Sequence, residues 1–404
     1  MSHLLSPHLL VDISAHGYGH VAQTLPVVNE LAKRISGLRV TVRSAAPLAL
    51  LQQRIRCDFR HISVALDFGM KMANAVDVQI AESAAAYRDY HADWDAKVQH
   101  AADEMRALQP DLLLANVPYM SLAAAKVAGV RAAAMCCLNW ADLYRHYCAD
   151  DAASAAIHAH MLDAYNSAEV FLKVQPTMPM PDLRNARSIN PIAQLGRNQR
   201  TQIDAHLPSL LPSCRGGERS EGAIGMGVEL WHAPGSTPSP ALPLQGGGDV
   251  AVAPPEKLIL VAMGGIAYRL PMEHWPRIED VRWLIPQDWN IKRDDMIAFD
   301  SLGLTFSDVL ASCDAVLTKP GYGTFAEAAC AGVPVLYVSR RDWPEEPYLV
   351  QWLQQHGVCC EVERERLQSG DIEGMLRDLW AQPQLPVPIA SGAAEAAEIL
   401  AGMM

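Results

Sequence analysis

The chain has 404 residues, of which 50% are hydrophobic and 19% charged, and its formal net charge is −12. The length is enough for two or three domains, and the composition is ordinary for a globular protein that buries apolar cores. An acidic chain lacks the basic surface typical of nucleic-acid-binding proteins, so we expect no nucleic-acid partner.

The cysteines and the apolar segments bear on the cellular compartment. The nine cysteines show no CxxC spacing, which favours reduced, buried thiols. The N-terminal segment has no basic region of the kind that opens a signal peptide, and the most apolar stretch, 112–138, is interrupted by charged and polar residues. We therefore predict a cytoplasmic protein without a transmembrane segment. A peripheral membrane contact and the oligomeric state are left open.

The first half of the chain alternates strands with helices. The patterns predict strands at 8–15, 38–45, 111–116 and 130–138, and helices after the turn at 16–20, at 79–108 and at 119–128. Gly129 stands where a helix C-cap glycine belongs. A strand, a glycine-containing turn, a helix and a second strand begin a doubly wound parallel sheet.

The composition changes between residues 207 and 255. Those 49 residues contain 9 Gly and 8 Pro, a level at which aperiodic sequence usually stays unstructured. We interpret this stretch as a disordered insertion in the connection between two domains. The predicted organisation is therefore an N-terminal domain at 1–206, the insertion at 207–255, a C-terminal domain at 256–390 and a terminal helix at 391–404.

The second half begins again at Lys257 with a buried strand that runs into a glycine pair. A strand at 313–318, a helix at 324–331, a strand at 333–339 and a helix at 348–355 follow. The tryptophans of this half, Trp275, Trp283 and Trp289, are expected to pack its core rather than to stack on a ligand.

The turn at 319–324, KPGYGT, is a candidate phosphate site. Gly321 and Gly323 permit a tight strand-to-helix turn, and a helix beginning at Thr324 would direct free amides and its positive end toward an anion. Glu327, one turn into that helix, could accept hydrogen bonds from a ribose diol. The structural alternative is a capping box formed by Thr324 and Glu327.

The turn at 16–20, HGYGH, is a candidate catalytic element. It follows the first strand of a parallel sheet, where ligands bind in α/β proteins. A histidine suits proton transfer because its unperturbed pKa, about 6.5, lies near working pH. The alternative is that His16 or His20 only caps the helix or fills the turn.

Together these segments resemble the GT-B glycosyltransferases, which include the bacterial cell-wall N-acetylglucosaminyltransferase and the plant and macrolide glycosyltransferases. The likeness extends to the glycosyltransferase-like N-terminal half of plant L-arabinokinases. The features that carry it span residues 8 to about 357 apart from the insertion. They are the HGYGH turn, the strand ending in Met263-Gly264-Gly265, the GYGT turn, Glu327, and RRDWPEEPYL at 340–349.

The resemblance implies an α/β protein of the GT-B type, with two Rossmann-like, doubly wound parallel-sheet domains facing each other across a cleft. It assigns the acceptor to the first domain and the nucleotide-sugar donor to the second. The residues it implies for nucleotide-sugar binding are Gly17, Gly19, Gly264, Gly265, Lys319, Gly321, Tyr322, Gly323, Thr324, Glu327, Glu345 and Glu346.

The resemblance also implies roles for single residues. His20 aligns with the general base of inverting GT-B enzymes, and His16 is the second choice. Glu345 and Glu346 occupy the place where such enzymes hold donor-sugar hydroxyls, although the cell-wall enzyme has glutamines there. A solvated acidic turn between two prolines is the alternative for this pair.

The residue that would steady the catalytic base departs from the family pattern. Several plant enzymes have an Asp after the strand that matches 111–115, whereas this chain has Asn116. An amide can orient an imidazole ring but cannot stabilise its cation by charge. Asp12 and Asp142 are the candidates to substitute for the missing carboxylate.

Metal and phosphate contacts complete the candidate site. Asp93-Trp94-Asp95 matches a DxD metal motif but falls within a helical pattern, so we predict no metal. GT-B enzymes commonly stabilise the leaving group with helix dipoles and hydrogen-bond donors. Lys319 and Arg341 are candidates for phosphate charge, or equally surface residues.

The sequence therefore predicts a glycosyltransferase that moves a sugar from a nucleoside diphosphate donor, by default a UDP-sugar, to an unidentified hydroxyl acceptor. We expect inversion, no metal and no cofactor, because the nucleotide sugar is a substrate. One alternative is a nucleotide-sugar epimerase or hydrolase on the same fold. The other is a non-catalytic nucleotide-sugar sensor or scaffold.

Overall fold

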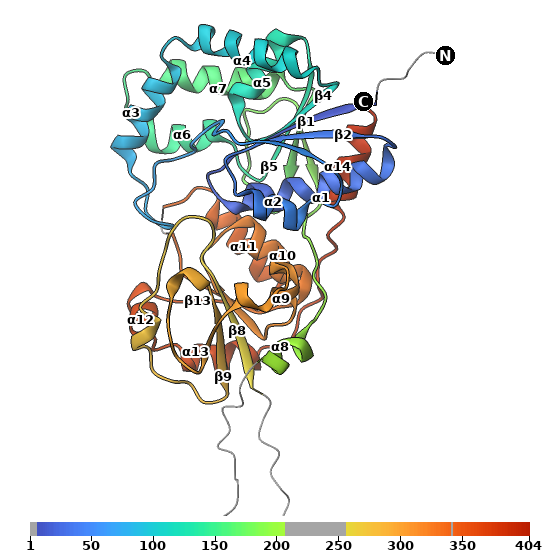
Figure 1. Cartoon of the computed structure of the whole chain (residues 1–404). Coiled ribbons are helices and arrows are strands. Elements are labelled where there is room, and N and C mark those ends of the chain that lie inside the picture. The colour runs from blue at the N-terminus through green and yellow to red at the C-terminus, as the bar shows by residue number, and fades with distance from the viewer. Residues whose placement is uncertain (1–5, 207–255, 341) are drawn as a thin grey trace, which may run out of the picture.

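The computed structural model describes residues 6–206, 256–340 and 342–404. The insertion predicted at 207–255 lies outside the described residues. The described chain forms two α/β halves, which Figure 1 shows one above the other.

The first half is a parallel sheet with the strand order β3-β2-β1-β4-β5-β6-β7. Its elements are β1 (His8–Ile13), α1 (Tyr18–Arg34), β2 (Arg39–Arg43), α2 (Leu48–Arg54), β3 (Arg60–Ile62), α3 (Ile80–His91), α4 (Trp94–Leu108), β4 (Leu112–Asn116), α5 (Tyr119–Ala128), β5 (Arg131–Cys136), α6 (Trp140–Cys148), α7 (Ser154–Ser167), β6 (Val170–Val174) and β7 (Ala186–Ile189).

The second half is a parallel sheet with the order β10-β9-β8-β11-β12-β13. Its elements are α8 (Arg200–His206), β8 (Lys257–Ala262), β9 (Val281–Ile285), β10 (Met296–Ala298), α9 (Phe306–Ala311), β11 (Ala315–Thr318), α10 (Tyr322–Ala331), β12 (Val335–Tyr337), α11 (Glu346–His356), β13 (Cys359–Glu361), α12 (Arg364–Ser369) and α13 (Glu373–Ala381). The last helix, α14 (Gly392–Ala401), packs on α1 of the first half.

These two sheets confirm the predicted fold class of two doubly wound, parallel-sheet domains. In both sheets the chain first adds strands on one side of the first strand, β1 or β8, and then on its other side. The crossovers on the two sides run in opposite directions, which leaves a crevice at the carboxyl ends of the strands. Trp275, Trp283 and Trp289 lie in the buried core of the second half, as predicted.

Several predicted elements have other bounds in the structure. The helix expected at 79–108 is two helices, α3 and α4, which are separated at Asp93 by a left-handed backbone with φ 52°. The helix expected at 324–331 begins at Tyr322. The predicted strand at 8–15 ends at Ile13.

Within the described residues, the chain crosses between the halves twice, and the two crossings are in contact. The first runs from β7 to α8, and the second runs from α13 to α14. Asn190 in the first donates from Nδ2 to Ser391 Oγ in the second at 2.9 Å. A Cβ on Gly392 would lie 1.9 Å from the Asn190 carbonyl oxygen, so only glycine permits this approach.

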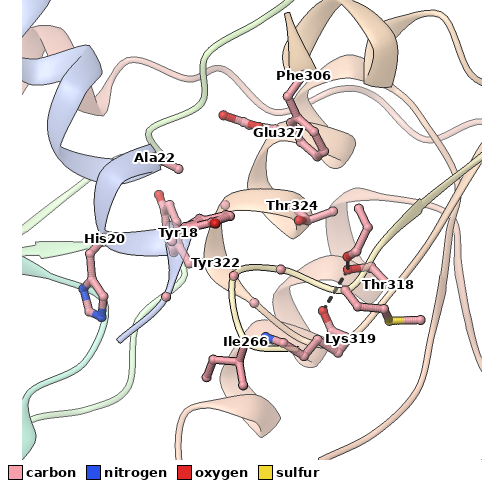
Figure 2. Close-up of a pocket in the computed structure, with 18 of the residues that line it drawn as sticks. Tyr18, His20, Ala22, Ile266, Phe306, Thr318, Lys319, Tyr322, Thr324 and Glu327 are labelled. Carbon is pink, nitrogen blue, oxygen red and sulfur yellow. Dashed lines mark hydrogen bonds between the residues drawn. The ribbon is translucent and has the colours of Figure 1, made fainter. Parts of the chain in front are cut away.

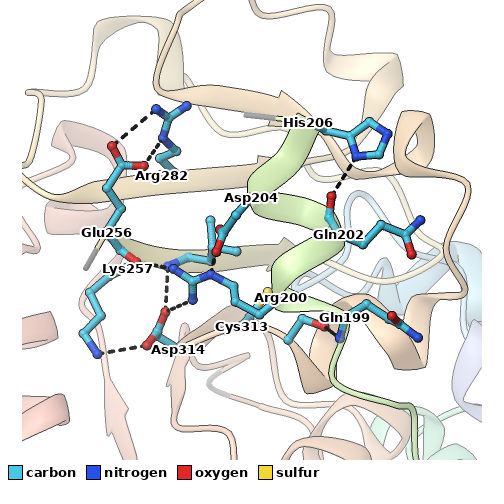
Figure 3. A network of polar contacts seen from close by, with 12 residues as sticks. Gln199, Arg200, Gln202, Asp204, His206, Glu256, Lys257, Arg282, Cys313 and Asp314 are labelled. Atoms are coloured by element: carbon cyan, nitrogen blue, oxygen red, sulfur yellow. Dashed lines mark hydrogen bonds and ion pairs between the residues drawn. The ribbon is translucent and has the colours of Figure 1, made fainter. Parts of the chain in front are cut away.

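The first crossing is anchored to the second sheet by an ionic network (Figure 3). Arg200 of α8 pairs with Asp314, which also accepts from Lys257 at the start of β8. Asp204 holds the same guanidinium from one turn further along α8. The network fixes α8 against the second sheet, and thereby sets where the crossing ends.

Candidate functional site

A cavity of about 690 Å³ lies between the two halves, at the carboxyl ends of both sheets. Nearly every residue proposed as part of the site lines it. They are His16, Gly17, Gly19, His20, Gly264, Gly265, Lys319, Gly321, Tyr322, Gly323, Thr324, Glu327 and Glu345. Figure 2 shows His20, from α1, on one side and Lys319, Thr324 and Glu327 on the other. Glu346 does not line the cavity.

His20 is held by the residue that departs from the family pattern. Register pairing of β1 with β4 sets Ile13 opposite Asn116, which brings the turn that follows Ile13 beside that amide. The Asn116 Oδ1 atom lies 2.9 Å from His20 Nδ1, while its Nδ2 donates to Gln23 Oε1 at 3.2 Å. An amide oxygen only accepts, so Nδ1 carries a hydrogen, and in the neutral form of the ring Nε2 has the lone pair. The amide therefore orients the ring as a base.

Neither carboxylate considered as a substitute reaches His20. Asp12 forms a buried bidentate pair with Arg43, at 2.8 and 2.6 Å. The carboxylate of Asp142, in the first turn of α6, pairs with Arg145 at 2.9 Å and accepts from Asn139 Nδ2 at 2.8 Å. Their charges are used elsewhere.

A carboxylate that the sequence analysis missed lies near His20. Asp67 is buried, and it accepts from Ser14 Oγ at 2.6 Å and from Trp140 Nε1 at 2.8 Å. Burial raises its pKa, although these hydrogen bonds and the His20 charge act in the opposite direction. Asp67 thus contributes negative potential without touching the imidazole.

A thiol also adjoins His20. Burial lowers the pKa of the His20 imidazole, but the Cys136 sulfur, 3.6 Å from Nδ1, and the Asn116 oxygen raise it more strongly, to about 9. Against the opposing effect of burial, a hydrogen bond from Cys137 and the charge of His20 lower the pKa of Cys136 to about 6. This buried pair makes His20 a stronger base than an isolated histidine.

His16 is packed against neighbouring side chains and is not placed to act as a base. Its Nδ1 bonds the Phe68 carbonyl oxygen at 3.1 Å, and its ring stacks on Trp343 and meets the edge of Trp140. Burial, with the nearby charges of His20 and Arg340, lowers its pKa to about 3. His16 is therefore neutral at physiological pH.

This lowered pKa predicts an acid-dependent loss of stability. His16 stays neutral in the fold down to about pH 3, whereas an unfolded histidine protonates near 6.5. Stability contributed by the neutral ring is therefore full above pH 6.5 and falls below it, by about 2 kcal/mol between pH 7 and 5. Urea unfolding of a His16→Asn variant should show a smaller decrease over that interval. An equal decrease in both proteins would contradict the assignment.

The turn before α10 leaves backbone amides free at the cavity. Gly321 is the N-cap and makes no side-chain cap, so the first amides of the helix have no partner from a capping side chain. Thr324 is the third helical residue, and the capping box considered for Thr324 and Glu327 is therefore wrong. An anion at this helix end would complete the vacant hydrogen bonds.

Glycines let the two halves meet at this turn. Gly323 lies against α1, where an added Cβ would sit 3.0 Å from Ala22 Cβ. At Gly265 an added Cβ would approach the Tyr18 ring to 2.8 Å. Both glycines therefore narrow the gap between the halves beside the cavity.

Tyr322 lines the cavity with its ring but directs its hydroxyl away from it. The hydroxyl accepts from the Ile192 amide and donates to the Gln175 carbonyl oxygen, each at 2.9 Å. Its polar group therefore ties α10 to the first half and its crossing, rather than facing a ligand.

Glu327 lies at the cavity in a buried ion pair. Arg54, at the end of α2, donates to its two oxygens at 2.6 and 3.3 Å, and both side chains are at most 10% exposed. The pair bridges the two halves. Sequence reasoning missed Arg54, because the partners are 273 positions apart.

The segment 339–346 forms the remaining wall. Glu345 accepts from Cys137 Sγ at 2.8 Å and from Trp343 Nε1 at 3.0 Å. Glu346 instead accepts from Ser339 Oγ and from the Arg340 amide, so it shapes the loop. Arg340, which sequence reasoning also missed, lines the cavity. Arg341 lies outside the described residues.

The candidate metal motif lies away from this site. Asp93 and Asp95 stand at the start of α4 and do not line the cavity. Among the described residues, one group could hold a metal, namely Asp142, His158 and Asp182, and Arg145 pairs with both of its carboxylates.

Several known proteins are similar to this chain in structure or in sequence. No protein-family model matches the chain. The calicheamicin glycosyltransferase CalG4 is similar in structure, with a TM-score of 0.58 and 16% identity over 99% of this chain and 98% of that one. The chain has the GT-B fold. UGT89C1 of Arabidopsis thaliana, solved with UDP, shares this GT-B architecture at a TM-score of 0.50 and 11% identity, covering 98% of this chain and 99% of that one.

A likeness in sequence accompanies the GT-B fold. The L-arabinokinase of Arabidopsis thaliana is 23% identical over 394 residues, which cover 90% of this chain. The chain spans 31% of the length of that relative. Both resemblances inferred from the motifs, to GT-B glycosyltransferases and to plant L-arabinokinases, are thereby confirmed.

Among the described residues, no helix is both long enough and apolar enough to cross a lipid bilayer.

Proposed function

We propose that the protein transfers a glycosyl group from a nucleoside diphosphate sugar, by default a UDP-sugar, to a hydroxyl acceptor. The observation that carries the proposal is the arrangement across one cavity of a base and an anion site. On the side of the first half, His20 Nε2 has no hydrogen-bond partner among the described residues. The uncapped start of α10 and Lys319 lie on the side of the second half.

The donor nucleotide is assigned to the second half. Its diphosphate would accept hydrogen bonds from the free amides that follow Gly321, and Lys319 would add a positive charge. Lys319 forms no ion pair among the described residues, and burial, reinforced by Arg340, lowers the pKa of its ammonium. A bound diphosphate would stabilise the charged form. Glu327 would accept from the ribose hydroxyls with the lone pairs that Arg54 leaves unused.

The reaction would be a single displacement. The acceptor oxygen forms a bond to the anomeric carbon as the bond from that carbon to the diphosphate oxygen breaks, and His20 Nε2 takes the acceptor proton. Attack from the face opposite the diphosphate inverts the anomeric centre. Charge that develops on the leaving diphosphate is met by the α10 amides and Lys319, so the step uses no metal ion.

Calorimetric titration tests the donor assignment. We expect one of UDP, GDP, TDP and ADP, by default UDP, to bind the wild-type protein, and a Lys319→Met variant to bind it about 10-fold more weakly because a charge-assisted contact is lost. Exchange of an exposed lysine, Lys33→Met, is the matched control and should leave binding unchanged. If the wild-type protein binds none of the four, the proposed transferase function is wrong.

A further inference from the structure

Arg340 is a buried cation that faces the cavity without an anionic partner. Its side chain is 8% exposed, and its guanidinium lies over the Trp343 ring, 4.4 Å from the ring centre. Nε donates to the Ala75 carbonyl oxygen at 3.3 Å. Within the described residues its two terminal nitrogens have no hydrogen-bond partner, and its charge has no ion pair. A buried charge in this state is costly unless a ligand completes it.

The two carboxylates whose charges act on this guanidinium, Glu345 and Glu346, already have hydrogen-bond donors of their own. Glu345 receives its hydrogen bonds from Cys137 and Trp343, and Glu346 receives its own from Ser339 and the Arg340 backbone amide. Both act on the guanidinium through space but lie beyond ion-pair distance from it. Acceptors therefore engage the backbone amide and Nε of Arg340, while its two terminal nitrogens have no partner among the described residues.

Arg340 and Lys319, the lysine of the proposed phosphate site, line the same cavity but have different neighbours. Lys319 Nζ adjoins the glycine turns, where Cβ atoms added to Gly264 and Gly321 would lie 3.5 and 3.7 Å from it. Arg340 is instead fixed by Ala75 of the first half and by Trp343, which stacks on His16. Among the described residues, two cations without an ion-pair partner thus line one cavity. Lys319 adjoins the glycine turns, and Arg340 adjoins Trp343 and His16, on the side where the sugars would meet.

We propose that Arg340 binds an anionic group, a carboxylate or a phosphate, carried by one of the two sugar substrates beside His20. The planar guanidinium presents two parallel donors that match either group, and the Trp343 ring holds its plane. This inference rests on the proposed transferase function and specifies its substrate class. A uronic acid on the donor and a sugar phosphate as acceptor are the two sources of such a group.

Calorimetry on the wild-type protein and an Arg340→Met variant separates these sources. The first arm compares UDP-glucuronate with UDP-glucose. The second compares D-glucose 6-phosphate with D-glucose, each added to the UDP-bound protein. In one arm we expect the anionic probe to bind at least about 10-fold more tightly than its neutral counterpart, as a charge-assisted contact provides. Arg340→Met should abolish that preference and leave the affinity for UDP within about 3-fold.

Two further variants serve as controls for the calorimetry. Arg340→Lys keeps the charge and should retain part of the preference, which distinguishes a lost contact from a disturbed fold. Lys319→Met should weaken UDP and both UDP-sugars equally. If the wild-type protein binds UDP but prefers neither anionic probe, or if Arg340→Met weakens UDP as strongly as the sugars, the inference is overturned and the transferase proposal stands. If the wild-type protein does not bind UDP or another nucleoside diphosphate, both fail.

Discussion

Replacing His20 with glutamine is expected to slow glycosyl transfer by about 10²- to 10⁴-fold, the usual contribution of a positioned general base. Glutamine can still bond Asn116 but cannot accept a proton at the place of Nε2. The binding of the donor should change little, because His20 lies on the opposite side of the cavity from Lys319 and Thr324. The measurement is release of the nucleoside diphosphate, together with the affinity for it by calorimetry.

The wild-type rate should also rise with pH. A general base works in its neutral form, and the pKa of His20 is raised to about 9, so the fraction of competent enzyme increases toward that value. His100→Gln is the matched control, since His100 is 79% exposed and lies outside the cavity. A His20→Gln protein as active as this control would exclude His20 as the base.

The second large effect concerns stability. Glu327→Ala should reduce the free energy of unfolding by about 3–5 kcal/mol, because it leaves the buried guanidinium of Arg54 without its partner. The same substitution should also weaken nucleotide binding through the loss of the carboxylate proposed for the ribose. Urea unfolding monitored by tryptophan fluorescence measures the first effect.

A second variant distinguishes a stranded charge from a general defect. In the double variant Arg54→Met, Glu327→Ala, no charge is left buried, so much of the lost stability should return. Glu273→Ala serves as the control, since it breaks an exposed pair with Arg269 and should leave the free energy of unfolding nearly unchanged. If Glu327→Ala is no more damaging than Glu273→Ala, the buried pair does not stabilise the interface.

The parts of the site that could be predicted from the sequence are short segments of consecutive residues. HGYGH and KPGYGT each run from the end of a strand into the first turn of the helix that follows it. Parallel-sheet topology then sets both segments at the edge where ligands bind. Asn116 could be weighed as a partner of the base because it ends the strand next to β1. Such inferences need only periodicity, turn chemistry and the rules of strand order.

The residues that escaped prediction are joined across long distances. Arg54 meets Glu327 and Arg340 meets Ala75 only because the halves dock, and no pattern within either segment signals the contact. Asp67 belongs to a stretch without clear periodicity. The break at Asp93 was missed because helical spacing of apolar residues continues on both sides of it, although the backbone of Asp93 itself is left-handed. Tertiary packing decides all of these.

The two chain crossings between the halves have a mechanical consequence. Asn190 of one is bonded to Ser391 of the other, and Gly392 lets their backbones touch, so the two crossings are held together as one pair. If the halves move, such a pair would act as a single pivot and not as two independent tethers. A paired pivot resists sliding of one half along the other while it allows rotation about its own axis. Opening and closing of the cleft would then follow a single swing, which returns His20 and the start of α10 to the same alignment at each closure.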